Sequence, residues 1–557
     1  MVIACPSAPS RLRFRNMRAR SVALVSLSVL LLGRLAPATA APPPSEFGTD
    51  YADPRTPAPP VAVPHTRHCS VEIVRNGFKN FDPYTSTYTP PAACRGPWSK
   101  VVFRMQGSVK GVQYDRLGHI TIGGVGVFRT STPEPSTDGI SWQVEKDVSA
   151  YIPLLRSPQP VVMELGNVVN ETYTGVLDIT VTLDFYRTGP GAPAARTASA
   201  VLPLQDQRRE DSDLVGTATL PRNTSRLLGE VYVTGSGGGC EEFWDTSAPP
   251  STGYSCPDGS PYREVEVQID GRVAGIALPY PYIYTGGWSN PYAWRPSPAP
   301  RAFDIKPLQY DLTPFAGLAS DGKPHEFRVH VVGVPAGQSG WFTVPSLHVW
   351  TDARSKQTSG SITSYSVTPL TKSDEVTGSS GAAGSVLTKA SRSLKISGYV
   401  ETSAGRIRTT VERTLSNSSD HVWEAGESRD TLDASWRDLS VVTTGAKVER
   451  TDLTYGKSGY ISFLPHATIP DAYDVVTDLD IYDRSRMSTA IAGRIVADRK
   501  TEETYDGRAS WIYNVPRDQR HATGTQTVRY RESGTGGCYD HALSAVNGFY
   551  TKDYYRC

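Results

Sequence analysis

Three carboxylates in this chain stand in surroundings that could adapt them to acid–base chemistry. Asp115 is followed directly by Arg116 and precedes the apolar step at residues 120–122, which places the pair at the mouth of a predicted sheet. Glu164 falls two predicted strands further on, and Glu242 lies in a later loop. A carboxylate can activate water when burial or a second acid raises its pKa, while a neighbouring guanidinium keeps it ionised. These residues are the candidates for hydrolytic chemistry.

On spacing alone, a structural explanation is the more economical one. Asp115 and Arg116 would then form an ion pair at a strand end, and residues 240–244 would be a solvated hairpin tip. The hydrolytic explanation requires Asp115 and Glu242 to occupy matching loops of two neighbouring domains and to face one cleft between them. Clefts between domains are common places for ligand sites.

The aromatic residues add weight to a binding site. Trp244, Trp288 and Trp294 lie in loops rich in Gly, Pro and Tyr, and Arg295 follows Trp294. Exposed Trp and Tyr rings stack well on the faces of sugars, and an Arg can read their hydroxyl groups. A single Trp is more often part of the core between two sheets, but for the group sugar binding is a competitive explanation. No lipase-type GxSxG motif, dinucleotide fingerprint or phosphate loop is found.

The first 40 residues read as a secretory signal peptide. A basic start precedes an apolar run at residues 22–32 and a small-residue cleavage site at residues 38–40. The apolar run is too short to span a bilayer as a stable helix, and no other stretch is long and apolar enough. We therefore expect a secreted or periplasmic protein without a membrane span, acting as a monomer.

Charge and cysteine content narrow the class of protein further. Residues 1–40 hold six arginines and no acidic residue, so their removal lowers the formal charge from +1 to −5. This mildly acidic balance, without a run of Lys or Arg, argues against nucleic-acid binding.

Six cysteines remain, and in an oxidising compartment an even number predicts disulfides. No two cysteines have the spacing of zinc ligands, so we expect no metal. The close spacings favour the pairs Cys69–Cys94, Cys240–Cys256 and Cys538–Cys557.

The rest of the chain reads as strand after strand. Residues 41–66 are rich in Pro and Ala and predict an extended linker. Short segments rich in Val, Ile, Thr and aromatics follow, bounded by Gly, Pro, Asn and Asp, and a second block repeats the first weakly but in order. We predict an all-β fold: two tandem jelly-roll sandwiches packed side by side, at residues 67–187 and 200–353, then a third β-rich domain at residues 361–557.

Many short motifs, in order, carry a resemblance to a known family. They are Tyr88-Thr89-Pro90-Pro91, Trp98-Ser99-Lys100-Val101-Val102, Val112-Gln113-Tyr114-Asp115-Arg116, Arg129-Thr130-Ser131-Thr132-Pro133-Glu134-Pro135, Asn167-Val168-Val169-Asn170, Tyr173-Thr174-Gly175, Glu242-Phe243-Trp244 and Trp294-Arg295-Pro296. On these residues the chain resembles the peptide-N-glycanase A family, amidases that cleave the bond between Asn and the first N-acetylglucosamine of an N-glycan. The likeness extends over most of the chain that follows the signal peptide.

The resemblance implies two jelly rolls with the active site between them. It implies an essential Asp in an Asp-Arg step and a supporting Glu two residues after a Cys, which fall on Asp115, Arg116 and Glu242. Glu164 matches the supporting acid of the first domain by strand position, and Arg295 matches a substrate-binding Arg. The implied substrate is an N-glycosylated peptide or protein, and no metal or cofactor is implied.

The expected reaction starts with Asp115 activating water for attack on the Asn side chain. Arg116 and Glu242 would orient Asp115 and polarise the amide, while Arg295 and the aromatics hold the inner sugars. Two alternatives stay open on the sequence alone. One is a glycosidase that cuts within the chitobiose core with two carboxylates. The other is a glycan-binding protein without catalysis, because jelly rolls host many lectins.

Overall fold

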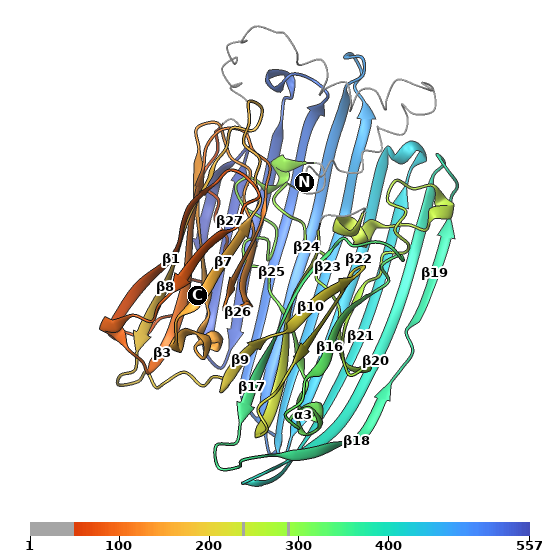
Figure 1. Cartoon of the computed structure of the whole chain (residues 1–557). Coiled ribbons are helices and arrows are strands. Elements are labelled where there is room, and N and C mark those ends of the chain that lie inside the picture. The colour runs from red at the N-terminus through yellow and green to blue at the C-terminus, as the bar shows by residue number, and fades with distance from the viewer. Residues whose placement is uncertain (1–49, 237–239, 287–289) are drawn as a thin grey trace.

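The computed structural model describes residues 50–236, 240–286 and 290–557, and it is built almost wholly of antiparallel strands. The predicted signal peptide at residues 1–40 and Trp288 lie outside the described residues. The prediction of an all-β fold is confirmed (Figure 1). Short 3-10 helices punctuate the loops: η1 (Ala92–Cys94), η2 (Ser149–Tyr151), η3 (Leu154–Arg156), η4 (Glu241–Thr246), η5 (Pro250–Thr252), η6 (Pro291–Trp294), η7 (Ala425–Glu427) and η8 (Arg517–Gln519).

The first eight strands form two four-stranded sheets that share one core. Side chains alternate between inside and outside along a strand, so a strand with one covered face buries every second residue. On one strand, for example, Val161, Met163 and Leu165 are buried while Glu164 between them is exposed. One sheet has the order β1 (His68–Phe78), β8 (Leu177–Arg187), β3 (Trp98–Val109), β6 (Ile140–Asp147), and the other β2 (Tyr84–Tyr88), β7 (Gln159–Leu165), β4 (Leu117–Ile122), β5 (Val125–Ser131).

The next nine strands build a second sandwich with the same strand order. Its first sheet runs β9 (Ala200–Pro203), β17 (Trp341–Thr351), β12 (Thr224–Gly235), β15 (Leu308–Asp311), and its second β10 (Gln205–Glu210), β11 (Asp213–Ala218), β16 (His325–Val332), β13 (Glu264–Ile269), β14 (Arg272–Ala277). Apart from the additional edge strand β10, each strand takes the place of its counterpart in the first sandwich. One short helix, α3 (Thr313–Ala319), follows β15. The weak internal repeat in the sequence thus corresponds to a repeated topology.

The remaining strands form one large sheet. They are β18 (Ser359–Val367), β19 (Thr371–Thr377), β20 (Gly384–Thr402), β21 (Gly405–Trp423), β22 (Arg429–Thr444), β23 (Lys447–Pro465), β24 (Tyr473–Ile491), β25 (Arg494–Tyr513), β26 (Thr523–Gly534), β27 (Gly537–Val546) and β28 (Phe549–Tyr555). From β20 onward each strand pairs with the next along the chain. Strand β21 alternates strictly between buried and exposed residues, so one face of the sheet is covered and the other is wet.

The long sheet lies against both sandwiches (Figure 1). Its covered face shares a continuous hydrophobic core with the second sandwich, in which Trp244 and Tyr280 pack against Trp436 and Tyr455. The first sandwich has a separate core. The second sandwich and the C-terminal sheet are therefore joined by one core, whereas the first sandwich keeps its own.

Residues 50–66, expected to be part of a linker, contact both the first sandwich and the last strands of the chain. They contain no helix, and they lie along the first sandwich and the last strands. The Ala52 amide donates to the Gly548 carbonyl at 2.9 Å, and Arg55 forms an ion pair with Asp553 at 2.8 Å. The Lys100 ammonium donates to the Ala62 carbonyl at 2.7 Å. This segment joins the first sandwich to the C-terminal sheet.

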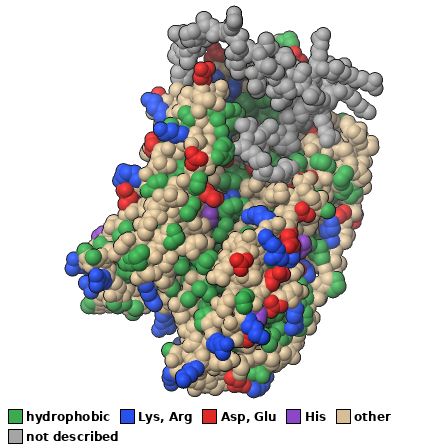
Figure 2. Space-filling model, viewed as in Figure 1, with side chains coloured by type: hydrophobic (Ala, Val, Ile, Leu, Met, Phe, Trp, Pro, Cys, Tyr) green, Lys and Arg blue, Asp and Glu red, His purple; other side chains and the backbone are tan. Residues whose placement is uncertain are grey.

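The described surface mixes both signs of charge. Acidic and basic side chains are interspersed over the face shown in Figure 2. Among the described residues, no helix has the length and apolar character needed to cross a bilayer.

Candidate functional site

Asp115 lies at the end of the loop between β3 and β4, where the two sandwiches meet. The Gly286 backbone N–H, from the second sandwich, donates a hydrogen bond to its carboxylate. The Ser131 hydroxyl at the end of β5 donates to Asp115 Oδ2 at 3.4 Å. Burial raises the pKa of Asp115 to about 6, although these hydrogen bonds and the charge of Arg116 oppose the rise. Asp115 can therefore gain and lose a proton near neutral pH.

Arg116 points away from its neighbour in sequence. Its Nη2 donates to Gln113 Oε1 at 2.7 Å and its Nε to Asn167 Oδ1 at 3.2 Å. Asn167 in turn donates to the carbonyls of Phe78 and Gly175 at 2.9 and 3.0 Å. Arg116 thus joins its own loop to the loop between β7 and β8, which Asn167 ties to the end of β1, and it acts on the Asp115 carboxylate through its charge. The structure shows no direct ion pair between the two within the described residues.

Glu242 comes from the second sandwich, on η4 beside the Cys240–Cys256 disulfide. Its side chain is 8% exposed, and no described group forms a hydrogen bond with its buried Oε2. Burial, together with the negative charge of Asp115, raises the pKa of Glu242 to about 8. A buried carboxyl that has no partner among the described residues is costly in its ionised form, so Glu242 holds its proton at neutral pH. The two predicted acids interact across the boundary between the sandwiches.

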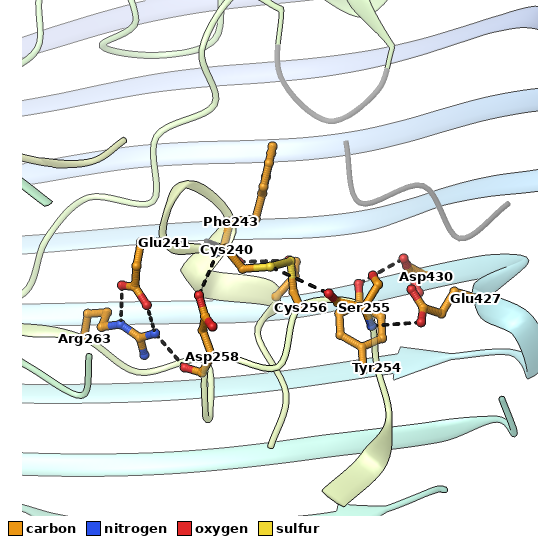
Figure 3. Close-up of a disulfide and its surroundings, with 11 residues drawn as sticks. Cys240, Glu241, Phe243, Tyr254, Ser255, Cys256, Asp258, Arg263, Glu427 and Asp430 are labelled. Atoms are coloured by element: carbon orange, nitrogen blue, oxygen red, sulfur yellow. Dashed lines mark hydrogen bonds and ion pairs between the residues drawn. A yellow bond between two sulfur atoms is a disulfide. The ribbon is translucent and has the colours of Figure 1, made fainter. Parts of the chain in front are cut away.

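The adjacent Glu241 has the opposite surroundings. It is fully buried and forms an ion pair with Arg263 at 2.6 Å (Figure 3). The Cys240 amide next to it donates to Asp258 at 2.7 Å, and the disulfide closes the loop. Of two consecutive acids, Glu241 is held in a satisfied structural pair while Glu242 is left available for chemistry.

A third acid, Glu134, joins the cluster and was missed as a site residue by sequence reasoning. Its carboxylate accepts from Arg295 Nη2 at 2.8 Å. Burial raises the pKa of Glu134 to about 7, with Arg295 lowering it and Asp115 adding to the rise. Tyr51 donates its hydroxyl hydrogen to the Glu134 carbonyl, and the Arg295 guanidinium lies 5.3 Å from the centre of the Tyr51 ring. The available signal was the position of Glu134 between two prolines directly after a strand.

Gly286 brings Asp115 and Glu134 together. A methyl group on its Cα would lie 2.3 Å from Asp115 Oδ1 and 2.8 Å from Glu134 Oε1. The backbone of the second sandwich therefore touches both carboxylates of the first. The negative charge of Asp115 raises the pKa of both Glu134 and Glu242, and Asp115 has the lowest pKa of the three.

The contact between the sandwiches is backbone-rich and buried. The Ser131 amide donates to the Ala302 carbonyl at 2.8 Å, and the Ile305 amide donates to the Arg129 carbonyl at 3.1 Å. The Ser131 hydroxyl also meets the Thr285 hydroxyl at 3.0 Å. Every residue of β5 is buried. The acids are thus positioned by a rigid boundary and not by loops alone.

Three other predicted site residues lie elsewhere. Glu164 is exposed on β7, because its neighbours Met163 and Leu165 take the inward positions of the alternating strand. Trp244 and Trp294 are 2% and 3% exposed and pack under the C-terminal sheet, contrary to the expected sugar-stacking role. The exposed aromatic beside Asp115 is instead Tyr114, 39% exposed, whose ring centre lies 5.4 Å from that of Tyr173.

The cysteines follow the predicted pairing in two cases of three. Cys240–Cys256 and Cys538–Cys557 are disulfides, whereas Cys69 and Cys94 are free thiols. Burial and the adjacent Cys94 raise the pKa of Cys69 to about 12, so the two thiols are neighbours without a bond. Within the described ranges, no three His, Cys, Asp or Glu side chains are grouped to hold a metal ion.

Comparison with known proteins places this geometry in context. Residues 57–368 match the family model described as peptide N-acetyl-beta-D-glucosaminyl asparaginase amidase A. Peptide-N4-(N-acetyl-beta-glucosaminyl)asparagine amidase A of Prunus dulcis is 33% identical over 383 residues, which is 63% of this chain and 66% of that protein. The chain therefore spans just under two thirds of the length of this relative.

Two solved structures have weaker similarity. PNGase F, a glycosylasparaginase from Flavobacterium meningosepticum, has 12% identity and a TM-score of 0.34, covering 51% of this chain and 96% of that one. PNGF-II has 14% identity and a TM-score of 0.38, covering 52% of this chain and 66% of that one.

Proposed function

Because the chain belongs to the peptide N-acetyl-beta-D-glucosaminyl asparaginase amidase A family, we propose that it hydrolyses the amide bond between Asn and the innermost N-acetylglucosamine of N-glycopeptides. The observation that carries this proposal is the meeting of Asp115, Glu134 and Glu242 from two sandwiches, each with a raised pKa. Amide hydrolysis needs a base for the water and an acid for the departing nitrogen, and carboxyls with separated pKa values supply both.

In the proposed reaction Asp115 is the base. Its ionised carboxylate takes a proton from water while the water oxygen attacks the side-chain carbonyl carbon of the substrate Asn. Glu242, protonated at neutral pH, donates its proton to the nitrogen as the carbon–nitrogen bond breaks, and proton exchange with water then returns Asp115 and Glu242 to their starting states. The products are a peptide in which Asn has become Asp and a glycosylamine. Atoms and charge balance without any further reactant.

Binding of the substrate falls to the groups around the acids. Arg295, held by Glu134 and lying over the rings of Tyr51 and Tyr292, is the cation nearest the cluster for a sugar hydroxyl or an acetamido carbonyl. Tyr114 is exposed next to Asp115 and offers a ring for stacking on a sugar face. Arg116 braces the loop that carries both Tyr114 and Asp115.

The test is product analysis of a defined N-glycopeptide by mass spectrometry. The proposal expects free glycan and a peptide with Asp in place of the glycosylated Asn. A peptide that keeps one N-acetylglucosamine would make the protein a glycosidase acting within the chitobiose core. Saturable binding of the glycopeptide without any product would make it a lectin. Either of these results would overturn the proposal.

The pH dependence of kcat/KM should be bell-shaped. Activity needs Asp115 ionised and Glu242 protonated, so it should rise through pH about 6 and fall through pH about 8. Initial rates on an uncharged glycopeptide from pH 4 to 9 measure this profile, and Glu242→Gln should lose the alkaline fall. An optimum below pH 5 would contradict the assignment of Asp115 as the base.

Gly286→Ala should damage the site without unfolding the protein. The added methyl group would meet both the Asp115 and Glu134 carboxylates at less than contact distance, so the acids must separate. Because a displacement of about 1 Å can cost about 100-fold in rate, we expect kcat/KM to fall by about 10- to 100-fold. Gly536→Ala is the matched control, because Gly536 lies in the turn between β26 and β27, has no positive φ, and has no atom within 4 Å of the added methyl group. Equal activity of the two variants would contradict the close approach.

We also propose that the protein acts outside the cytoplasm. The basic and apolar pattern of residues 1–40 supports this, as does the disulfide Cys240–Cys256 beside Glu242, since disulfides persist in oxidising compartments. Peptide sequencing of the protein exported by its source would test the cleavage after residue 40.

A further inference from the structure

The C-terminal sheet contacts both loops of the second sandwich that carry active-site residues. We propose that this sheet positions the active site, with Gln526 of β26 fixing Arg295 and Lys457 of β23 fixing the loop of Glu242. The inference rests on the proposed function for its catalytic consequence. Both residues lie beyond residue 368, where the match to the family model ends.

Gln526 uses its whole amide on the backbone around Arg295. Its Nε2 donates to the carbonyls of Ala293 and Arg295 at 2.9 and 2.8 Å. Its Oε1 accepts from the Ser297 amide at 2.8 Å. The side chain is only 5% exposed, so these bonds are shielded from water. One side chain of the sheet therefore sets the backbone on both sides of Arg295.

Other residues of the sheet hold the same stretch. Asn290 donates from Nδ2 to the Ala509 carbonyl of β25 at 3.0 Å, and the Tyr505 hydroxyl donates to the Ala293 carbonyl. The Trp294 ring lies 5.1 Å from the Tyr505 ring. This explains why Trp294 is buried: it anchors the turn that aims Arg295 at Glu134.

The loop of Glu242 is attached in a similar way. Lys457 forms an ion pair with Asp245 at 2.7 Å, and both side chains are 2% exposed. Further along the loop, Glu427 accepts from the Ser255 amide at 2.9 Å and Asp430 accepts from the Tyr254 hydroxyl at 3.1 Å (Figure 3). The Cys240–Cys256 disulfide connects these contacts to the residues that precede Glu242. The sheet thus holds the disulfide-closed loop both near its start, at Asp245, and near its end, at Tyr254 and Ser255.

Through these contacts the sheet holds the loops of the residues that bind substrate. The sheet residues do not contact substrate themselves. Arg295 and Glu242 sit on loops whose own short 3-10 helices offer little rigidity. Catalytic groups need to be held close to their productive geometry by side chains that are themselves locked by packing and hydrogen bonds. Gln526 and Lys457 are therefore positioning residues.

The test compares Gln526→Ala with Asn417→Ala in the full-length chain. Asn417 is a matched control, because its amide is also 5% exposed but donates to the Ser435 carbonyl within the sheet. Three quantities are measured: kcat/KM on a glycopeptide, the melting temperature, and amide hydrogen exchange of residues 290–301. We expect Gln526→Ala to lower kcat/KM by about 10- to 100-fold and to speed exchange at Ser297. Asn417→Ala should lower the melting temperature alone.

Each outcome bears on the inference. Wild-type kcat/KM in Gln526→Ala, or an equal loss in both variants, would overturn it, because the effect would then be absent or only one of stability. If Gln526→Ala does not fold, Tyr505→Phe removes a single hydroxyl bonded to the same turn and should reproduce the loss in part. If the wild-type protein releases no glycan, the proposed function fails, and unchanged exchange at residues 290–301 would separately overturn the positioning role.

Discussion

Replacing Asp115 with Asn should abolish glycan release while the protein stays folded. The change keeps the size of the side chain and removes the carboxyl with the lowest pKa of the three acids. Removal of a general base costs about 10²- to 10⁴-fold in rate, and we expect kcat to fall by that amount. Turnover of a fluorescent glycopeptide, with the melting temperature recorded in parallel, measures both effects.

The same substitution should alter the neighbouring acids. The charge of Asp115 raises the pKa of both Glu134 and Glu242, so both values should fall in Asp115→Asn. Asp184→Asn is the control: Asp184, on β8, is also buried, but its partner is Arg104 on the neighbouring strand β3, at 2.6 Å. Asp184→Asn should keep the turnover of the wild type. Wild-type turnover in Asp115→Asn would show that the base is another residue.

Glu241→Gln and Glu242→Gln should have opposite effects although the residues are adjacent. Glu242→Gln removes the acid, and we expect kcat/KM to fall about 100-fold. Glu241→Gln leaves the Arg263 charge buried without its counter-charge, which costs about 3–5 kcal/mol of stability. Its folded fraction should keep near-normal turnover. Measuring kcat/KM and stability for both variants distinguishes the residue that acts in catalysis from the residue that stabilises the loop.

The stability that Glu242→Gln gains over the wild type should grow as the pH rises. The pKa of Glu242 is about 8 in the folded protein, against an ordinary value of 4.5, so the folded state binds the proton more tightly. Its contribution is fully present below pH about 4 and is lost as the pH rises through about 8. Glutamine removes this loss, and at pH 7 the variant should gain up to about 3 kcal/mol over wild type. Denaturant unfolding at pH 4 and pH 7 measures the difference. A variant less stable than wild type at pH 7 would contradict the unpartnered state of Glu242.

The strand pattern could be predicted because its signal is local: alternating apolar residues specify strands. Spacing alone favoured a structural role for Asp115 and Glu242, and both became candidate site residues through the apparent internal repeat and the motifs that resemble the peptide-N-glycanase A family. The alternation on β7 also contained the answer for Glu164: the apolar residues on either side of it take the core face, so the acid must face outward.

The remaining site residues depend on contacts that sequence spacing does not contain. Glu134 and Gly286 are about 150 residues apart, yet the backbone of Gly286 touches the Glu134 carboxylate because β5 packs on the second sandwich. Trp244 and Trp294 lie in loops whose Gly, Pro and Tyr content is typical of exposed sugar-binding surfaces. They are buried because a third element, the C-terminal sheet, covers the loops that carry them. Burial of a loop side chain is decided by what packs on it.

The most direct test of the central claim is hydrolysis of one N-glycopeptide in heavy-oxygen water, with the wild-type protein and Asp115→Asn side by side. The account predicts that the wild type releases the glycan and leaves a peptide whose new Asp carries one heavy oxygen, while Asp115→Asn leaves the glycopeptide intact. Free glycan accompanied by a peptide that retains Asn or an N-acetylglucosamine, or equal release by both proteins, would contradict it.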